Sequence, residues 1–186
     1  TRGSDEDVAY AIACVTVFGS AAMLILPFLA VLPGLTAEGY GFWVGATVHE
    51  VAQVVAAGFA KGDVAGHMGT IAKLTRVMML APLVLTLGVI ATRRNRGEAA
   101  GRFEMPWFVL GFVAMAGLNS AVTIPAQLHD GLVVTTTFLL TAALAAMGYE
   151  TDIRRLCKKG IRPFALAAIA SLYIVVAGFL LVTNFL

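Results

Sequence analysis

The chain has 186 residues, of which 59% are hydrophobic and only 13% are charged, and its mean hydropathy is +0.87. A soluble globular domain is about 45–50% apolar and about 25% charged, so this composition excludes an ordinary soluble domain and indicates a protein of the lipid bilayer. The net charge of +2 gives no reason to expect a nucleic-acid partner, and we expect none.

Six apolar segments approach the length needed to cross a bilayer, because about 20 helical residues span a hydrocarbon core of about 30 Å. We predict spans over residues 8–32, 42–60, 69–92, 106–121, 132–148 and 163–185. The sequence therefore predicts an all-α fold, a polytopic membrane helix bundle of about six spans. We expect residues 1–186 to form a single transmembrane domain.

The first predicted span begins after an acidic cluster, residues 5–7, which suits the positive end of a helix dipole. Inside this span, Thr16 is a weaker candidate for contact with a substrate. Threonine in a span commonly bonds its own backbone, and the same reservation applies to Thr47 in the second span.

The second predicted span holds an imidazole, a carboxyl and an amide within about one helical turn: His49, Glu50 and Gln53. Ionisable side chains inside a span are rare, and by default they mark a substrate or proton route. A carboxylate at mid-span costs about 2.5–3.5 kcal/mol even on the lenient insertion scale. We therefore favour a substrate or ion pathway, with hydrogen bonding between packed helices as the alternative.

Small residues surround this polar motif, among them Gly41, Gly45 and Gly58. They allow a neighbouring backbone to approach closely, and they would also let the helix unwind and turn its amides toward an anion. We predict an interrupted or re-entrant helix near Gly45–Gly58, bent or broken between Gly45 and His49, with its polar side chains turned inward.

The polar motif approaches the zinc-protease pattern His-Glu-x-x-His without meeting it, because Gln53 occupies the place of the second histidine. One imidazole cannot hold a catalytic zinc. Neither Cys14 nor Cys157 has a partner at a metal-ligand spacing. We predict no metal, no cofactor and no enzymatic activity.

Two cations and a threonine lie early in the third predicted span: Lys73, Thr75 and Arg76. Lys73 and Arg76 share a helix face, and snorkelling to the headgroups is one interpretation. Only about 15 apolar residues remain after Arg76, however, which is short of the length of a span. We favour cations that face the bundle interior and meet Glu50 or an anionic substrate. Because Glu50 and Lys73 would differ in height on two regular helices, direct contact requires a broken second segment.

The fourth predicted span ends near Asn119, a weaker candidate for substrate contact. Basic residues are concentrated in the loops after the third and fifth spans: Arg93, Arg94, Arg96, Arg102, Arg154, Arg155, Lys158, Lys159 and Arg162. Opposite them stand only Arg2 and Lys61. The positive-inside rule predicts that the loops around Arg94 and Lys158 are cytoplasmic. With six full spans, both ends of the chain would face outward, a parity that fails if the second segment is re-entrant.

Three runs of the sequence resemble the bacterial YeiH-type inner-membrane family: residues 7–12, the run His49–Gly58, and residues 73–78 followed by Ala81-Pro82. The resemblance extends along essentially the whole chain and corresponds to the C-terminal half of a family member. It implies a multi-pass protein of the bacterial inner membrane that exports sulfate or a related small anion. It also implies membership of the cation:proton antiporter and anion transporter superfamily, and a longer protein whose preceding helices carry a Cys-Gly-Gly-Ser segment.

Three functional hypotheses follow. The leading one is a secondary transporter of a small inorganic or organic anion, with the lipid bilayer and that anion as its partners. In it, His49 and Glu50 are candidate proton carriers, Gln53 and Thr75 line the pathway, and Lys73 and Arg76 balance charge. The second is a membrane scaffold or assembly subunit that transports nothing. An intramembrane hydrolase is disfavoured, because the sequence offers neither a nucleophile–base pair nor a metal triad.

Overall fold

The computed structural model describes residues 5–31, 35–94, 107–122, 125–150 and 161–185. All regular structure in these ranges is helical, as the sequence predicts. The helices are α1 (Asp5–Leu29), α2 (Ala37–Thr47), α3 (Val51–Phe59), α4 (Asp63–Arg94), α5 (Trp107–Ala121), α6 (Ala126–Glu150) and α8 (Ile161–Phe185). Each predicted span corresponds to one helix, except that the second contains both α2 and α3. The loop around Lys158 lies outside the described residues.

Three of the described helices are long and apolar enough to cross a membrane, over residues 7–29, 127–149 and 161–185. The helices belong to two compact units, the first formed by residues 1–73 and 136–186 and the second by residues 74–135. Helices α4 and α6 each contribute to both units. The polar motif belongs to the first unit.

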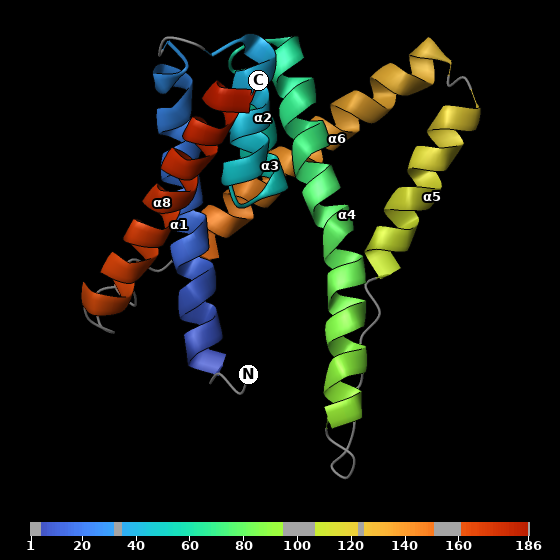
Figure 1. The fold of residues 1–186 in the computed structure, drawn as a ribbon. Helices are drawn as coiled ribbons and strands as arrows, with labels where there is room; N and C mark the ends of the chain where they lie inside the picture. Colours follow the sequence, from blue (N-terminus) through green and yellow to red (C-terminus); the bar gives the residue numbers. More distant parts are fainter. Residues whose placement is uncertain (1–4, 32–34, 95–106, 123–124, 151–160, 186) are drawn as a thin grey trace. The chain divides into compact units, whose positions relative to one another are not determined.

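Helices α2 and α3 form a re-entrant hairpin, visible beside α1 and α8 in Figure 1. Tyr40, early in α2, donates a hydrogen bond from its hydroxyl to the carbonyl oxygen of Ala57, near the end of α3, at 3.1 Å. Two helices joined in series could not make this contact unless the second ran back along the first. The predicted interruption is therefore confirmed, and it takes the re-entrant form.

Local chemistry sets the ends of the hairpin helices. Thr36 caps α2, since its hydroxyl accepts from the Gly39 amide at 3.0 Å. Val48 and Glu50 both have extended backbone angles (ψ 142° and 146°), which end one helix and precede the next. After α3 the chain turns at Gly62, whose φ of 107° lies in the region that favours glycine.

Helix α8 packs antiparallel to α2. The Trp43 indole nitrogen donates to the carbonyl oxygen of Val175 at 2.8 Å, and the Trp43 ring lies 5.3 Å from that of Phe179. Further along α8, Val182 lies against Gly39 at the start of α2. This contact buries the tryptophan almost completely.

Glycines allow α2 to lie directly against the first part of α4. A side-chain carbon added at Gly41 would meet the carbonyl oxygen of Ala65, and one added at Gly45 would meet that of Gly69. The two backbones are therefore in contact, as small residues in membrane helices permit. The close approach brings Lys73, further along α4, to the tip of the hairpin.

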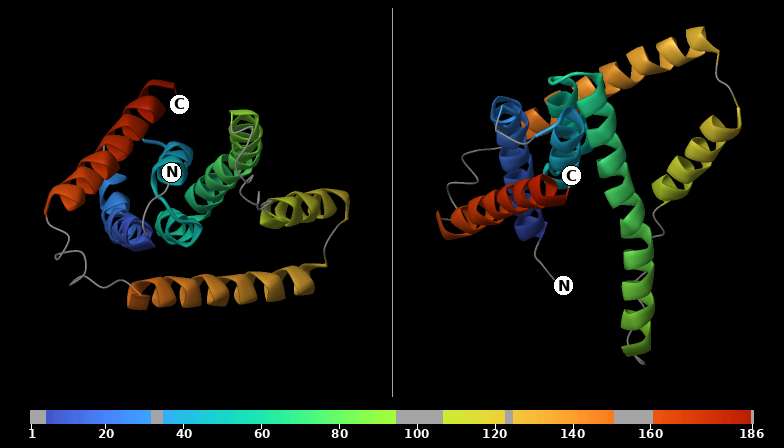
Figure 2. Two further views of the ribbon diagram at one scale, coloured as in Figure 1. Left: turned by 90° about the horizontal axis from the view of Figure 1, so that it is seen from below. Right: turned by 45° about the horizontal axis from the view of Figure 1, so that its top comes forward.

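The broken second segment meets the condition under which the six-span parity fails. Helix α1 runs parallel to α3, because Thr16 contacts Glu50 and Ser20 contacts Gln53. Since α3 and α8 are both antiparallel to α2, α1 and α8 run in the same general direction, as Figure 1 shows. They cross obliquely in the right-hand view of Figure 2. The start of α1 and the end of α8 therefore lie at opposite ends of the first unit, not on one side. The physical reason is that the second segment turns back instead of crossing.

Candidate functional site

The break between α2 and α3 is closed on one side by Lys73. This side chain is only 5% exposed, and its ammonium donates to the carbonyl oxygens of Val48, at 2.9 Å, and of His49. The last carbonyls of a helix have no intrahelical donor and carry the negative end of its dipole, so a cation stabilises them. Lys73 reaches the residues next to Glu50 because the second segment is broken. The sequence predicts such a break wherever Lys73 comes close to Glu50.

On the other side of the break, Glu50 is turned toward α1. Its Oε1 accepts a hydrogen bond from the Thr16 hydroxyl at 3.1 Å. Glu50 occupies the N-cap position of α3, but its side chain makes no capping hydrogen bond there. Its Oε2 is buried and has no donor among the described residues.

Gln53 is fully buried between α3 and α1. Its amide nitrogen donates to the Thr16 carbonyl oxygen at 3.4 Å and to the Ser20 hydroxyl at 3.3 Å. The amide oxygen lies against Gly19, where a side-chain carbon would collide with it. Like Glu50 Oε2, this oxygen is buried and receives no hydrogen bond within the described part of the chain.

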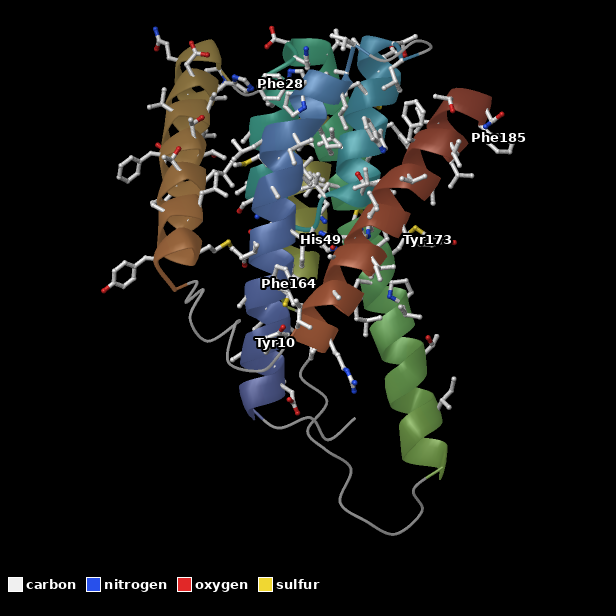
Figure 3. The ribbon with its side chains drawn as sticks, turned by 90° about the vertical axis from the view of Figure 1, so that its left-hand side faces the viewer. Tyr10, Phe28, His49, Phe164, Tyr173 and Phe185 are labelled. Atoms are coloured by element: carbon white, nitrogen blue, oxygen red, sulfur yellow. The ribbon has the colours of Figure 1, made fainter. Side chains whose placement is uncertain are left out.

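His49 is partly buried in the break itself. Figure 3 shows it part-way along the length of α1 and α8, with Tyr10 nearer the start of α1. Thr47, the preceding candidate, is buried and donates to the Trp43 carbonyl oxygen of its own helix at 2.7 Å. Thr47 thus makes the local bond that is common for threonine in a span.

The remaining predicted site residues are Thr75, Arg76 and Asn119. All three are exposed and belong to the second unit. They are therefore not part of the geometry described for the break. The structure brings together Thr16, His49, Glu50, Gln53 and Lys73 around it.

Sequence reasoning missed Ser20 and Gly19, which complete the α1 side of the site. Ser20 lies four residues after Thr16, so the two hydroxyls share a helix face. A search of the first span for polar residues at that spacing would have found this face. Gly19 could not have been singled out, because only the position of Gln53 shows what a larger residue would displace.

The two helix ends at the break differ in what they offer. The end of α2 is neutralised by Lys73, whereas the first amides of α3, residues 51–53, have no intrahelical acceptor and lie at the positive end of the α3 dipole. Such an end attracts an anion. Beside it stands the carboxyl group of Glu50, the N-cap residue of α3. Among the described residues, no three His, Cys, Asp or Glu side chains gather as a metal site would need.

Comparison with known proteins gives consistent matches. A family model described as conserved hypothetical protein 698 matches residues 1–167. The chain is 41% identical over 187 positions to UPF0324 membrane protein PA5383 of Pseudomonas aeruginosa, covering 95% of this chain and 53% of the relative. It is 40% identical over 181 positions to a UPF0324 membrane protein of Bacteroides thetaiotaomicron, covering 94% and 54%. It is 38% identical over 176 positions to UPF0324 membrane protein TauZ of Paracoccus pantotrophus, covering 93% and 52%.

The chain thus spans about half the length of the curated relatives it matches. No solved structure matches it. The names of the relatives and the long apolar helices identify a multi-pass membrane protein.

Proposed function

The chain belongs to the conserved hypothetical protein 698 family, and on that premise we propose that it is part of a secondary transporter that moves a small anion across the bacterial inner membrane. Sulfate, or an anion of similar size and charge, is the substrate we propose, with protons as the coupling ion. The activity belongs to the whole protein, of which this chain is a part.

The observation that carries the proposal is the broken helix inside the packed unit. Transporters commonly bind substrates and coupling ions where half-helices end inside the membrane, because unwound backbone and helix dipoles supply charge there. The break between α2 and α3 has this form, and the Lys73 ammonium is held at it. Irregular backbone at membrane depth is tolerated only when protein or a polar cavity surrounds it.

Each residue at the break has a role in the proposal. The uncapped start of α3 receives the anion through its first amides. Lys73 holds the unwound carbonyls of α2 in place, which keeps the two helix ends apart. Glu50 carries the coupled proton, because an ionised carboxylate beside the bound anion would repel it. His49 is the second candidate proton carrier, since imidazole titrates near neutral pH.

Flux through the intact protein in proteoliposomes tests this function. Sulfate, sulfite, chloride and a small carboxylate are offered in turn, with and without an imposed pH gradient. We expect uptake of at least one anion above that of protein-free vesicles, accelerated by the gradient. Glu50→Gln should remove the response to the gradient. No flux of any anion from well-folded protein would count against transport.

A membrane scaffold that transports nothing is the second candidate. It is favoured by the bonds from Gln53 and Thr16, which tie α1 to the hairpin and would also serve as structural links between helices. The same vesicle experiment separates the two, because a scaffold would lose thermal stability in the Glu50 and Gln53 variants without any flux to lose.

We also propose that the chain is not an enzyme. The motif around His49 lacks the second histidine of a zinc protease. Turnover of a peptide or ester by the purified protein, abolished by His49→Ala, would contradict this.

A further inference from the structure

The contact between α1 and α3 contains two buried oxygens that both need a hydrogen-bond donor. They are Glu50 Oε2 and Gln53 Oε1, and neither has one among the described residues. A buried acceptor left without a donor is destabilising, so native structures rarely keep one. Two at a single helix contact point to something that supplies the missing hydrogen.

The two side chains leave the same end of α3 and meet the same residue of α1. Glu50 is the N-cap of α3 and Gln53 is the third residue after it, a spacing at which side chains are neighbours on a helix surface. Both also meet Thr16 of α1, Glu50 through the Thr16 hydroxyl and Gln53 through the Thr16 carbonyl.

A metal ion does not fit these two oxygens, as a count of the ligands shows. The Thr16 carbonyl and the Ser20 hydroxyl already face the Gln53 NH₂ group, which would repel a cation. Only two oxygens remain, whereas hard cations take about six oxygen ligands. A single proton on Glu50 Oε2 meets both needs, because it turns one acceptor into a donor and directs it at the other.

We propose that Glu50 and Gln53 form the proton-binding site of this protein, with Gln53 as the residue that positions the proton. In the protonated state a continuous chain of hydrogen bonds joins α1 to α3. Thr16 donates to Glu50 Oε1, Glu50 Oε2–H donates to Gln53 Oε1, and the Gln53 amide donates to Ser20. The proton comes from water and returns to water, and no other bond changes.

The proposal rests on the proposed transport function in one respect, since it keeps the coupling proton on Glu50, adds Gln53 as its acceptor and leaves out His49. Its structural consequence is separate. When the proton leaves, the carboxylate and the Gln53 carbonyl become two facing acceptors, and the chain of hydrogen bonds is interrupted between them. The bonds from Thr16 to Glu50 and from Gln53 to Ser20 do not need the proton.

Other titratable groups lie on the elements around Glu50. They include Tyr10 and Cys14 of α1, Tyr40 of α2, His49 in the break and Lys73 of α4. The Lys73 ammonium is bonded to the carbonyl oxygen of His49, the residue before Glu50 in the sequence.

Infrared difference spectroscopy of the intact purified protein tests the site without any transport measurement. We expect a protonated-carboxyl C=O band at low pH that disappears as the pH rises and is absent in Glu50→Gln. Gln53→Leu should move the band to higher frequency, because the hydroxyl loses its acceptor. Thr16→Val should move it as well, because the carbonyl loses its donor.

Matched controls make the result specific. Thr47→Val removes an equally buried hydroxyl that bonds only within α2 and should leave the band in place. Glu38→Gln removes the carboxyl in the first turn of α2 and should not remove the band. Persistence of the band in Glu50→Gln, or an unmoved band in both Gln53→Leu and Thr16→Val, would overturn the proposal.

A water molecule that donates to both oxygens is the competing arrangement. It would leave Glu50 ionised and give no carboxyl band at any pH at which the protein stays folded, which also overturns the proposal. A titrating, Gln53-dependent band without anion flux would instead uphold the proton site and reject the transporter. Anion flux that still responds to pH in Glu50→Gln would instead uphold the transporter and reject the proton site.

Discussion

At the scale of single residues, Gly19 shows how a position without a side chain can define a polar site. The Gln53 amide oxygen occupies the space that any larger residue at position 19 would need. The helix gains nothing locally from this choice, because glycine in a helix interior is less stable than alanine by about 1 kcal/mol. Gly19 therefore serves the contact between α1 and α3.

Gly19→Ala should destabilise the protein despite the better helix former. The gain of about 1 kcal/mol in helix propensity is opposed by a steric cost of about 1–3 kcal/mol for overpacking. Displacing Gln53 also loses two hydrogen bonds, each worth about 0.5–1.5 kcal/mol. We expect a lower thermal unfolding midpoint for the intact protein in detergent.

Gly117→Ala is the matched control for this substitution. Gly117 also lies within a helix, and a side-chain carbon there meets nothing within 4 Å. Its unfolding midpoint should stay level or rise. Equal shifts in the two variants would show that the space at position 19 is not the cause.

At the scale of elements, the sequence predicted the break in the second segment but not the reversal of its direction. Polar residues beside glycines indicate that a helix is interrupted, and Glu50 and Gln53 were found in this way. The reversal depends on contacts between distant residues, such as that of Tyr40 with Ala57. No local pattern encodes these contacts, because a bend and a reversal can use the same extended residues at the tip.

Lys73→Met should loosen the hairpin, because the ammonium is the described donor to two carbonyls of the unwound turn. Leaving a buried acceptor unpaired costs about 1–3 kcal/mol, so the unfolding midpoint should fall and anion flux should be lost. Lys73→Arg keeps the charge and should retain more of both.

Lys61→Met is the comparison for the lysine variant. It removes an exposed lysine in the turn before α4, and exposed substitutions usually change the free energy of unfolding by no more than about 0.5 kcal/mol. If Lys61→Met lowers the unfolding midpoint as much as Lys73→Met, the capping role assigned to Lys73 is wrong.

At the scale of the whole molecule, the direction of one hairpin changes the side on which the chain begins. Six full spans would place both ends of the chain on the outer side of the membrane. Because α1 and α8 are parallel, the start of α1 instead lies on the same side of the first unit as Arg162 at the start of α8. In the sequence, Arg162 follows Arg154, Arg155, Lys158 and Lys159. The positive-inside rule then assigns the start of α1 to the cytoplasm.

Cysteine labelling of the intact protein tests this topology. Asp7→Cys and Arg162→Cys, each at an exposed position in a background without Cys14 and Cys157, should react with an impermeant reagent only after the cytoplasmic face is opened. Asn184→Cys should react in intact cells. Labelling of positions 7 and 184 from the same side would restore the six-span parity.

The burial of Trp43 has an optical consequence. The chain has two tryptophans, Trp43 and Trp107, so Trp107→Phe leaves Trp43 as the single indole of this chain. Its ring is 2% exposed, and its N–H is bonded to Val175 of α8. Its fluorescence should therefore be blue-shifted at rest and move to the red whenever the hairpin separates from α8. The fold thus carries its own fluorescent reporter, which allows movement of the broken helix to be followed in real time without an attached dye.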